Sequence, residues 1–229
     1  MTRTLLCLLP LLLLAPGAAR AQAVDYVVDA KESELVVFLF KAGVARRFAH
    51  DHVVAATRFQ GTLRYDPQQP TKTQVEVVAE AASLEPDDPK LVKKHKVKNS
   101  ASEKDRAEIK ASLLGEDQLY AEKHKTIRFV ATGVKRHKDG RLLMTGKLTL
   151  RGKTKTLTFE LEQLELDKKG VLRGSCRFWI QQSWFGYEPY SAFLGAVKVK
   201  DRARIEVSLV GRVQPKKTPQ PPKKRTKEF

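Results

Sequence analysis

The chain has 229 residues, of which 41% are hydrophobic, and its formal net charge at pH 7 is +17. This length suits one large β-domain or two small ones and is sufficient to bury a core. Its two cysteines are Cys7 and Cys176. Because Cys7 falls in a predicted leader, an intramolecular disulfide is excluded in the mature chain. The excess of basic residues favours anionic surfaces such as phospholipid headgroups, lipopolysaccharide or nucleic acid.

Residues 1–21 have the pattern of a secretory signal peptide. Arg3 gives a positive start, residues 5–14 form an apolar run, and residues 19–21 (ARA) form a cleavage signal of the A-x-A type. The run is shorter than the roughly 20 apolar residues that a membrane-spanning helix needs. The sequence therefore predicts export to the periplasm, with secretion as the alternative. Export also disfavours nucleic acid as a partner.

Alternating apolar and polar residues predict β-strands along most of the mature chain, because successive side chains of a strand point to opposite faces. Residues 35–40, LVVFLF, are apolar on both faces, which predicts a strand covered on its outside as well as on its inside. The remaining ladders occupy residues 58–65, 74–81, 127–133, 142–150, 156–162, 172–180 and 203–209.

Three tight turns, at Asp139-Gly140, Arg151-Gly152 and Lys169-Gly170, predict an antiparallel meander in the C-terminal half. About eight long strands in an open sheet would leave aggregation-prone edges, and closure removes them. The expected fold class is all-β with a small helical insertion, built as an antiparallel β-barrel of about eight strands. A two-sheet sandwich is the alternative.

The helical insertion is expected at about residues 86–122. Its main helix has a capping box, an apolar stripe at helical spacing and a terminating glycine, which are Ser102 with Asp105, Ile109 with Leu113, and Gly115. A second short helix is expected at residues 116–121, and the basic run at residues 90–98 is expected to lie exposed. The insertion is expected to pack over a mouth or an outer face of the barrel.

Residues 214–229 contain four prolines and mostly polar or basic side chains, so they cannot build a core. They are expected to form a disordered basic tail after a folded domain of residues 22–213. One interpretation is an electrostatic tether to an anionic envelope surface, where each lysine contributes about 1 kcal/mol. The alternative is a solubilising tail without a fixed partner.

Four segments, in this order, resemble one family: YVVDAKESELVVFLFKAG, AATRFQGTLRYD, SEKDRAEIKASLLGEDQLYAEKHKTIRFVATGV and LTLRGKTKTLTFELE. This is the YceI-like family, also described as polyisoprenoid-binding or lipid-binding periplasmic proteins. The resemblance covers roughly residues 25–211. It implies an extended, lipocalin-like barrel whose elongated apolar cavity holds an isoprenoid or another long-chain amphiphile. Residues 49–52 and Lys125 depart from the family pattern and leave the ligand's identity open.

Small residues on the inward faces are compatible with a cavity, since they leave space in a barrel of about eight strands. These residues are Gly61, Ala79, Ala81, Ala131, Gly146 and Gly174. The alternative is that the glycines mark bulges and bends that curl the sheet. The candidates for lining the cavity, each of which can also be ordinary core, are Phe38, Phe40, Phe59, Leu63, Phe129, Leu148, Phe159, Phe178, Trp184 and Leu194.

His50 and His52 are the sharpest candidates for a chemical site. Residues two apart on a strand share a face, so both imidazoles could reach one metal ion, with His95 or His124 as a further ligand. Two histidines without a third ligand are weak evidence, and the neighbouring arginines disfavour a cation. A polar mouth that hydrogen-bonds a ligand headgroup is the preferred interpretation, and a solvated loop is the third.

The aromatic residues between 178 and 187 suit a rim where an amphiphile enters or a membrane is touched, or else a loop that plugs the barrel. Nothing in the sequence indicates catalysis. Ser183 and Ser191 lack the context of a nucleophile elbow, Cys176 alternates inward, and Asp87-Asp88 fits a solvated loop.

These patterns together predict an exported, non-enzymatic binding protein that holds an isoprenoid, a quinone or a similar amphiphilic lipid in an apolar barrel cavity. The lipid ligand and peripheral contact with an anionic membrane are the expected partners, and no cofactor other than a bound lipid is expected. The alternative is a solid barrel that binds polyanions or the envelope surface through its basic surface and tail. A metal site at His50 and His52 is the remaining hypothesis.

Overall fold

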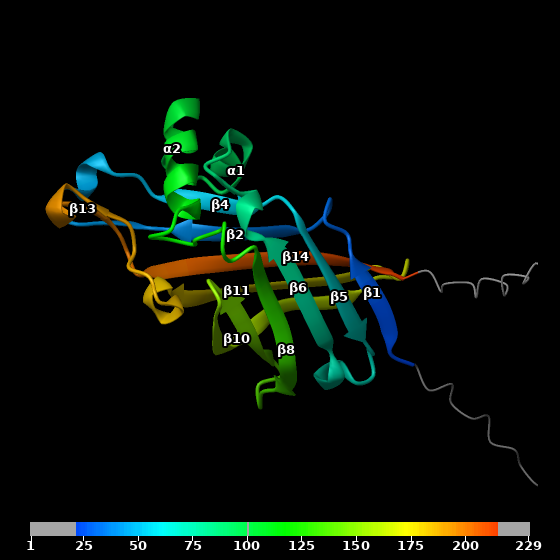
Figure 1. Cartoon of the computed structure of the whole chain (residues 1–229). Helices are drawn as coiled ribbons and strands as arrows, with labels where there is room; N and C mark the ends of the chain where they lie inside the picture. Colours follow the sequence, from blue (N-terminus) through cyan, green and yellow to red (C-terminus); the bar gives the residue numbers. More distant parts are fainter. Residues whose placement is uncertain (1–21, 100, 215–229) are drawn as a thin grey trace, which may run out of the picture.

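The computed structural model describes residues 22–99 and 101–214. The predicted leader and the predicted tail beyond Gln214 lie outside these residues. Figure 1 shows long strands wrapped around one another, with two helices standing over one side of the sheet. No helix in the described part of the chain is both long enough and apolar enough to cross a membrane.

Eight antiparallel strands close into a barrel, which confirms the predicted fold class. In spatial order they are β1 (Val24–Val28), β5 (Phe59–Tyr65), β6 (Gln74–Glu80), β8 (Thr126–Arg136), β9 (Leu142–Leu150), β10 (Lys153–Leu166), β11 (Leu172–Gln181) and β14 (Arg202–Val213). The first and last strands form the seam of the barrel, where Tyr26 lies opposite Val213 and Val28 lies opposite Gly211. The predicted meander is formed by β8 to β11.

Three further strands extend the sheet beyond the closed barrel. They are β2 (Glu34–Leu39), β4 (His52–Ala56) and β7 (Leu84–Pro86), in the order β14-β2-β4-β7. β14 pairs with β1 near its C-terminal end and with β2 further back, because Val28 lies opposite Gly211 and Glu34 lies opposite Ser208. The molecule therefore has a closed half and a second half, here called the upper half, in which the sheet continues as a flap.

Strand β2 is covered on both faces, as its apolar sequence predicts. Val36 and Phe38 are buried on the outer face together with Val53 of β4. The helix α1 (Pro89–Lys94) lies over this outer cluster and contributes Leu91 and other half-buried apolar residues to it. Alternation then directs Leu35, Val37 and Leu39 toward the inside of the barrel.

The helical insertion differs in part from the expectation. Helix α2 (Glu103–Leu114) begins with the predicted capping box and ends at Gly115. The second helix is α1, in the basic run before α2, where Asp88 caps the N–H groups of Lys90 and Leu91. Residues 116–121 form turns instead of a helix, because their N–H groups bond back to the C-terminal turn of α2 and bury Leu119 and Ala121.

A small three-stranded sheet caps one end of the molecule. It is formed by β12 (Ser191–Ala192), β13 (Val197–Val199) and β3 (Lys41–Ala42). In Figure 1 this sheet lies at the end opposite the two ends of the described chain. Short 3-10 helices at residues 46–48, 182–185 and 193–195 surround it.

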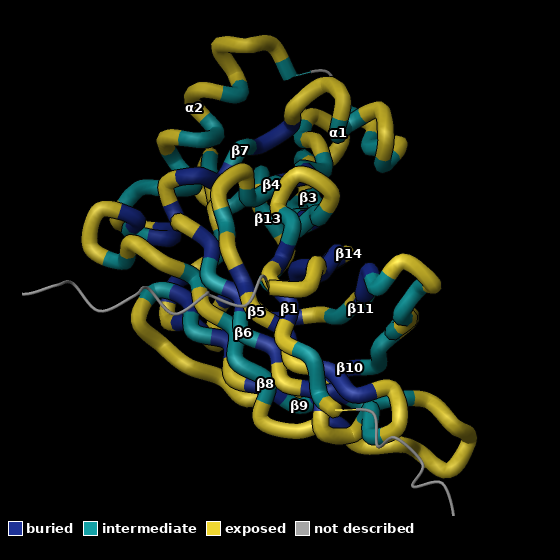
Figure 2. Tube along the Cα trace, turned by 90° about the vertical axis from the view of Figure 1, so that its right-hand side faces the viewer, coloured by how far each residue is buried: buried dark blue, intermediate teal, exposed yellow. Residues whose placement is uncertain are grey.

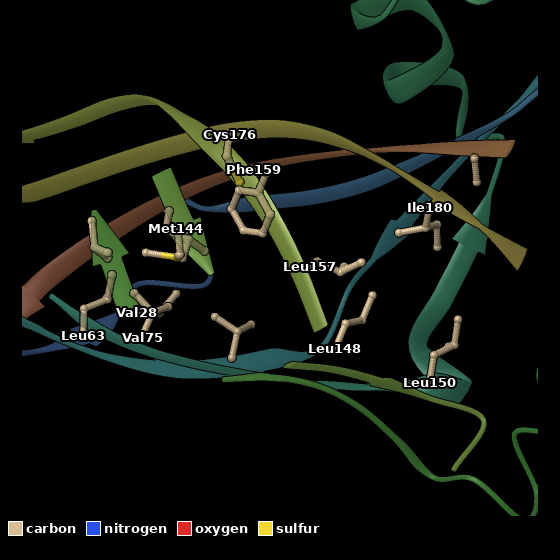
Figure 3. Close-up of a cluster of buried hydrophobic side chains, with 14 of the residues drawn as sticks. Val28, Leu63, Val75, Met144, Leu148, Leu150, Leu157, Phe159, Cys176 and Ile180 are labelled. Atoms are coloured by element: carbon tan, nitrogen blue, oxygen red, sulfur yellow. The ribbon is translucent and has the colours of Figure 1, made fainter. Parts of the chain in front are cut away.

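The core follows the inside of the barrel. Figure 2 shows buried positions alternating with exposed ones along the barrel strands. Figure 3 shows Met144 of β9, Phe159 of β10 and Cys176 of β11 lying together inside the barrel. Leu172 is among the most deeply buried side chains of this core. The period-two pattern of the sequence therefore corresponds to a dry inside and a wet outside.

Candidate ligand-binding site

The centre of the barrel contains a cavity of about 160 Å³, here called the barrel chamber. Inward side chains of β2 and β4 to β11, together with β14, form its wall. Thr73, Gln163 and Ser175 are the only lining residues with polar side chains other than the thiol of Cys176. Five of the predicted lining residues lie in this wall, namely Leu63, Phe129, Leu148, Phe159 and Phe178.

Aromatic rings form one side of the barrel chamber. Phe159 stacks on Phe178 with ring centroids 4.3 Å apart, and Phe129 lies 5.7 Å from Phe159. Gly146 admits the Phe129 ring, since a Cβ at this position would collide with it. This glycine therefore makes room for a side chain rather than for a ligand.

Gly174 has the opposite role. It lines the barrel chamber, and a Cβ built on it would have its nearest neighbour 3.8 Å away, an ordinary contact. Ala79 also lines the chamber, whereas Gly61 packs closely against Val28 and Val77. The small inward residues therefore leave space in the chamber at some positions and make room for neighbouring side chains at others.

A second cavity of about 290 Å³, here called the upper chamber, lies in the upper half of the molecule. Ile109 and Leu113 of α2 contribute apolar side chains to it, so the stripe predicted from the sequence faces this chamber. Its polar side chains are more numerous than those of the barrel chamber. They are His52, Asp105, Glu108, Ser112, Gln118, Gln182 and Tyr190.

The two chambers follow one another along the same strands. On β2, Leu35 and Val37 line the barrel chamber and Leu39 lines the upper chamber. On β4, Ala56 lines the barrel chamber, whereas His52 and Val54 line the upper chamber. The molecule thus offers an apolar chamber and, further along the same strands, a second chamber with polar groups.

His52 is held in place by a buried carboxylate. Its Nδ1 lies 2.7 Å from Oδ2 of Asp87, whose side chain is only 1% exposed. The other oxygen of Asp87 accepts a hydrogen bond from the N–H of Val53 at 3.0 Å. The expectation that Asp87 is solvated is wrong, because Asp87 is folded under β4 as the partner of His52. Since Nδ1 is occupied, Nε2 is the ring nitrogen left to meet a ligand.

Two carboxylates of α2 give the upper chamber a negative rim. Hydrogen bonds from the side chain and backbone of Ser102 hold the pKa of Asp105 below its usual value. Glu108 lies one helical turn away on the same chamber wall. At neutral pH this rim disfavours anionic groups of a ligand.

Cys176 faces the barrel chamber as a protonated thiol. Burial raises its pKa to about 12, and the carboxylate of Glu162 adds to this effect. A thiol with such a pKa is a poor nucleophile because the thiolate is the reactive form. Cys176 is therefore a packing residue and a natural reporter of the chamber.

Seven predicted site residues lie outside the barrel chamber, and all of them except His52 lie outside the upper chamber as well. Phe38 and Phe40 are on the outer face of β2, where Phe38 packs edge-on against His95 and Phe40 packs against Trp179. The prediction chose the wrong parity for this strand because both of its faces are apolar. The others are Phe59, which packs on the core, the half-exposed Trp184, and the exposed Leu194 and His50.

The histidines do not converge. His50 is exposed, His95 lies 3.0 Å from Glu34, and His124 packs edge-on against Tyr120. Within residues 22–99 and 101–214, no group of three or more His, Cys, Asp or Glu side chains is arranged to hold a metal ion. The geometry lends no support to the hypothesis of a metal site at His50 and His52.

The aromatic segment between 178 and 187 closes one end of the barrel. Phe185 is fully buried, and the buried Gln182 donates a hydrogen bond from Nε2 to the Lys200 carbonyl at 2.8 Å. Burial, together with the charge of Asp201, raises the pKa of Tyr187 far above its usual value. Most of the segment is thus a plug, although Trp179 and Trp184 remain partly exposed.

Residues 26–211 match the family model described as the YceI-like domain. Among curated proteins, a UPF0312 protein of Shewanella putrefaciens is 30% identical over 149 residues, which is 65% of each chain. A UPF0312 protein of Shewanella sp. (strain ANA-3) matches to the same extent. The alignment thus spans slightly less than two thirds of these relatives.

Solved structures share the fold at low sequence identity. BcnA of Burkholderia cenocepacia superposes with a TM-score of 0.60 and 17% identity, covering 80% of this chain and 98% of that one. The YceI protein of Campylobacter jejuni superposes with a TM-score of 0.51 and 16% identity, covering 71% and 84% of the two chains. At these identities the likeness concerns the fold alone.

Proposed function

The chain belongs to the YceI-like domain family, a family with a binding-protein fold, and on this premise we propose that it binds a long-chain amphiphile. The apolar chain of the ligand occupies the barrel chamber and its polar head lies in the upper chamber. The observation that carries this proposal is the order of the two chambers along β2 and β4, apolar first and polar second.

The size of the barrel chamber favours a thin apolar chain. Its volume of about 160 Å³ is close to that of an engineered apolar cavity of about 150 Å³ that stays dry and binds benzene. Each buried methylene contributes roughly 0.8 kcal/mol before ordering costs. A multi-isoprene chain is longer than this space, so it extends into the upper chamber or displaces flexible side chains such as Met144.

The upper chamber favours a neutral polar head. Nε2 of His52 and the hydroxyl of Tyr190 can hydrogen-bond a hydroxyl or carbonyl group. Asp105 and Glu108 on the rim repel a phosphate or carboxylate. We therefore favour an isoprenoid alcohol or a quinone over an isoprenoid phosphate.

The location and the non-enzymatic character are parts of the same proposal. The leader pattern of residues 1–21 supports export to the periplasm, where hydrophobic envelope lipids need a carrier. The thiol of Cys176 is protonated and is therefore a poor nucleophile. No activated nucleophile lies next to the His52–Asp87 pair among the described residues. Both features are consistent with binding without chemistry.

The decisive experiment fills the barrel chamber. In Gly174→Val the new side chain enters the chamber without meeting the backbone closely, so binding of an isoprenoid alcohol is expected to weaken at least about tenfold. Native mass spectrometry with a series of isoprenoid alcohols, isoprenoid phosphates and straight-chain alcohols measures the occupancy. Gly133→Val is the matched control, since a Cβ at Gly133 meets nothing within 4 Å.

Equal binding by the wild type, Gly174→Val and Gly133→Val would contradict the proposal. Tighter binding of the phosphates than of the alcohols would contradict the assignment of the head. The alternative function, a module that binds polyanions through its basic surface and tail, assumes a solid barrel. The presence of the barrel chamber argues against this assumption.

A further inference from the structure

The molecule turns large apolar side chains outward at the end capped by the small sheet. Two loops, residues 43–48 and 192–196, meet there and are here called the tip. The exposed fractions of its large apolar residues are 94% for Val44, 70% for Phe48, 81% for Phe193 and 110% for Leu194. Side chains this large are ordinarily packed inside a protein, and a cluster of them on the surface indicates a contact with another apolar phase.

Close backbone contacts hold the two loops of the tip together. The N–H of Ala45 donates to the Ala196 carbonyl at 2.9 Å, and β3 pairs with β13 just behind this contact. Gly43 has φ +88° and lies so close that a Cβ would collide with the Ala196 carbonyl. Backbone and small residues therefore fill the inside of the tip, and the large residues are left on the outside.

The backbone of the tip is strained where its largest side chains are presented. Phe193 and Leu194 have φ +51° and φ +53°, the left-handed region that bulky residues rarely adopt. Glycine or asparagine would relieve this strain. No packing of the Phe193 or Leu194 side chains within the described chain offsets it, since both are exposed. Strain retained without an internal contact is characteristic of functional positions.

Unpaired basic side chains surround the apolar tip. Residues 41–50 and 190–200 contain five lysines and arginines and no aspartate or glutamate. These five are Lys41, Arg46, Arg47, Lys198 and Lys200. None of them forms an ion pair with a carboxylate of the described residues, and the guanidinium of Arg47 lies 4.6 Å from the centre of the Phe48 ring. An apolar surface flanked by several cations is complementary to an anionic lipid bilayer.

We propose that the tip docks the protein on an anionic lipid bilayer. Phe48, Phe193 and Leu194 enter the boundary between headgroups and acyl chains, and the surrounding cations bind lipid phosphates. This goes beyond the proposed function, because docking requires no ligand in the chambers. The two are neighbours in space, since Tyr190 and Val199 line the upper chamber and the N–H of Val199 bonds to the Tyr190 carbonyl.

The test is sedimentation of the protein with vesicles of phosphatidylcholine, with and without phosphatidylglycerol. The apolar variant carries Phe48→Ser, Phe193→Ser and Leu194→Ser, and the charge variant carries Arg46→Gln, Arg47→Gln and Lys198→Gln. Each is expected to weaken binding to the anionic vesicles at least about tenfold. The matched control removes three cations from the barrel wall, Arg58→Gln, Arg64→Gln and Arg128→Gln, and is expected to change binding less than about threefold.

A fluorescent label locates the contact. Val44→Cys, labelled with an environment-sensitive dye, is expected to shift to the blue on anionic vesicles. Lys168→Cys, in the turn between β10 and β11 at the other end of the barrel, is the control and is expected not to shift. Urea unfolding of every variant verifies that the fold is retained.

Three outcomes would overturn the proposal. The apolar variant could bind anionic vesicles as the wild type does. Binding could be lost on removing residues 215–229 while the tip variants retain it, which would assign the contact to the tail. The wild type could dimerise in analytical ultracentrifugation and the apolar variant remain a monomer without any change in vesicle binding, which would make the tip an interface between copies.

Discussion

The barrel wall and the tip use the same kinds of residue in opposite ways. In the wall, large apolar side chains point inward, and several cations on the outside pair with carboxylates across neighbouring strands, as Arg128 does with Glu76 at 2.9 Å and Arg177 with Glu206 at 2.8 Å. At the tip, small residues are inside, large apolar residues are outside, and the cations lack such partners. The wall is thus complete by itself, whereas the tip is complementary to something outside the molecule.

The largest difference is expected in the reactivity of thiols placed in the two regions. Cys176 in the wall has a pKa of about 12, against an ordinary value of 9.0. At pH 8 its thiolate fraction, and hence its rate of alkylation, should be about a thousandfold lower than that of Val44→Cys at the tip. Peptide mass spectrometry after timed treatment with iodoacetamide resolves the two sites.

The pH dependence of the alkylation rate tests whether the pKa of Cys176 is raised in the folded protein. The alkylation rate of Cys176 in the folded protein should still rise about tenfold per pH unit between pH 9 and pH 11, because the thiolate fraction is still growing below its pKa. In urea the same thiol should level off above about pH 9. A plateau near pH 9 in the folded protein would show that the chamber is open to water.

Truncating a large side chain should lower the free energy of unfolding much more in the wall than at the tip. Leu172→Ala in the wall removes a side chain that is 1% exposed, and we expect the free energy of unfolding to fall by about 3 kcal/mol. Phe193→Ala at the tip removes an exposed ring, and we expect a change below about 0.5 kcal/mol. Urea titration followed by circular dichroism measures both. Equal losses would mean that the tip packs against the rest of the chain in solution.

The smallest expected effect is a gain in stability instead of a loss. Asparagine tolerates the left-handed backbone better than leucine does, so Leu194→Asn should raise the free energy of unfolding by about 0.5 to 1 kcal/mol. The same change should weaken vesicle binding. A substitution that stabilises the fold while reducing the interaction would identify strain that serves function. Leu209→Asn, within the buried core, is the contrasting control and should destabilise the protein strongly.

The sequence is sufficient to predict the barrel and much of its wall. Strict alternation in strands such as β9 and β10 leaves one choice of inner face, and Leu148 and Phe159 accordingly line the chamber. In β2 the alternation is absent, so the inner residues Leu35 and Val37 cannot be told from Phe38 by pattern alone. The apolar character of both faces does predict correctly that the outer face of this strand is covered.

Long-range contacts account for the remaining differences. The local sequence predicts that Asp87 is a solvated loop residue. The pairing of β7 with β4, which the local sequence does not reveal, brings it under His52. The tip depends on a contact between residues about 150 positions apart, Ala45 and Ala196, neither of which has a distinctive sequence context. Leu194 is a predicted lining residue of the cavity. Its left-handed backbone sends it to the surface instead.

The seam between β1 and β14 has a consequence for how the protein acquires its structure. The barrel closes only when the first strand and the last one meet, so closure cannot occur before residue 213 is available. Until then the edges of β1 and β11 have no partner, and such edges are prone to pair with other chains. Contacts between the two chain ends also make folding slow relative to helical proteins of this size. Late closure makes the final strand the step at which folding and aggregation compete.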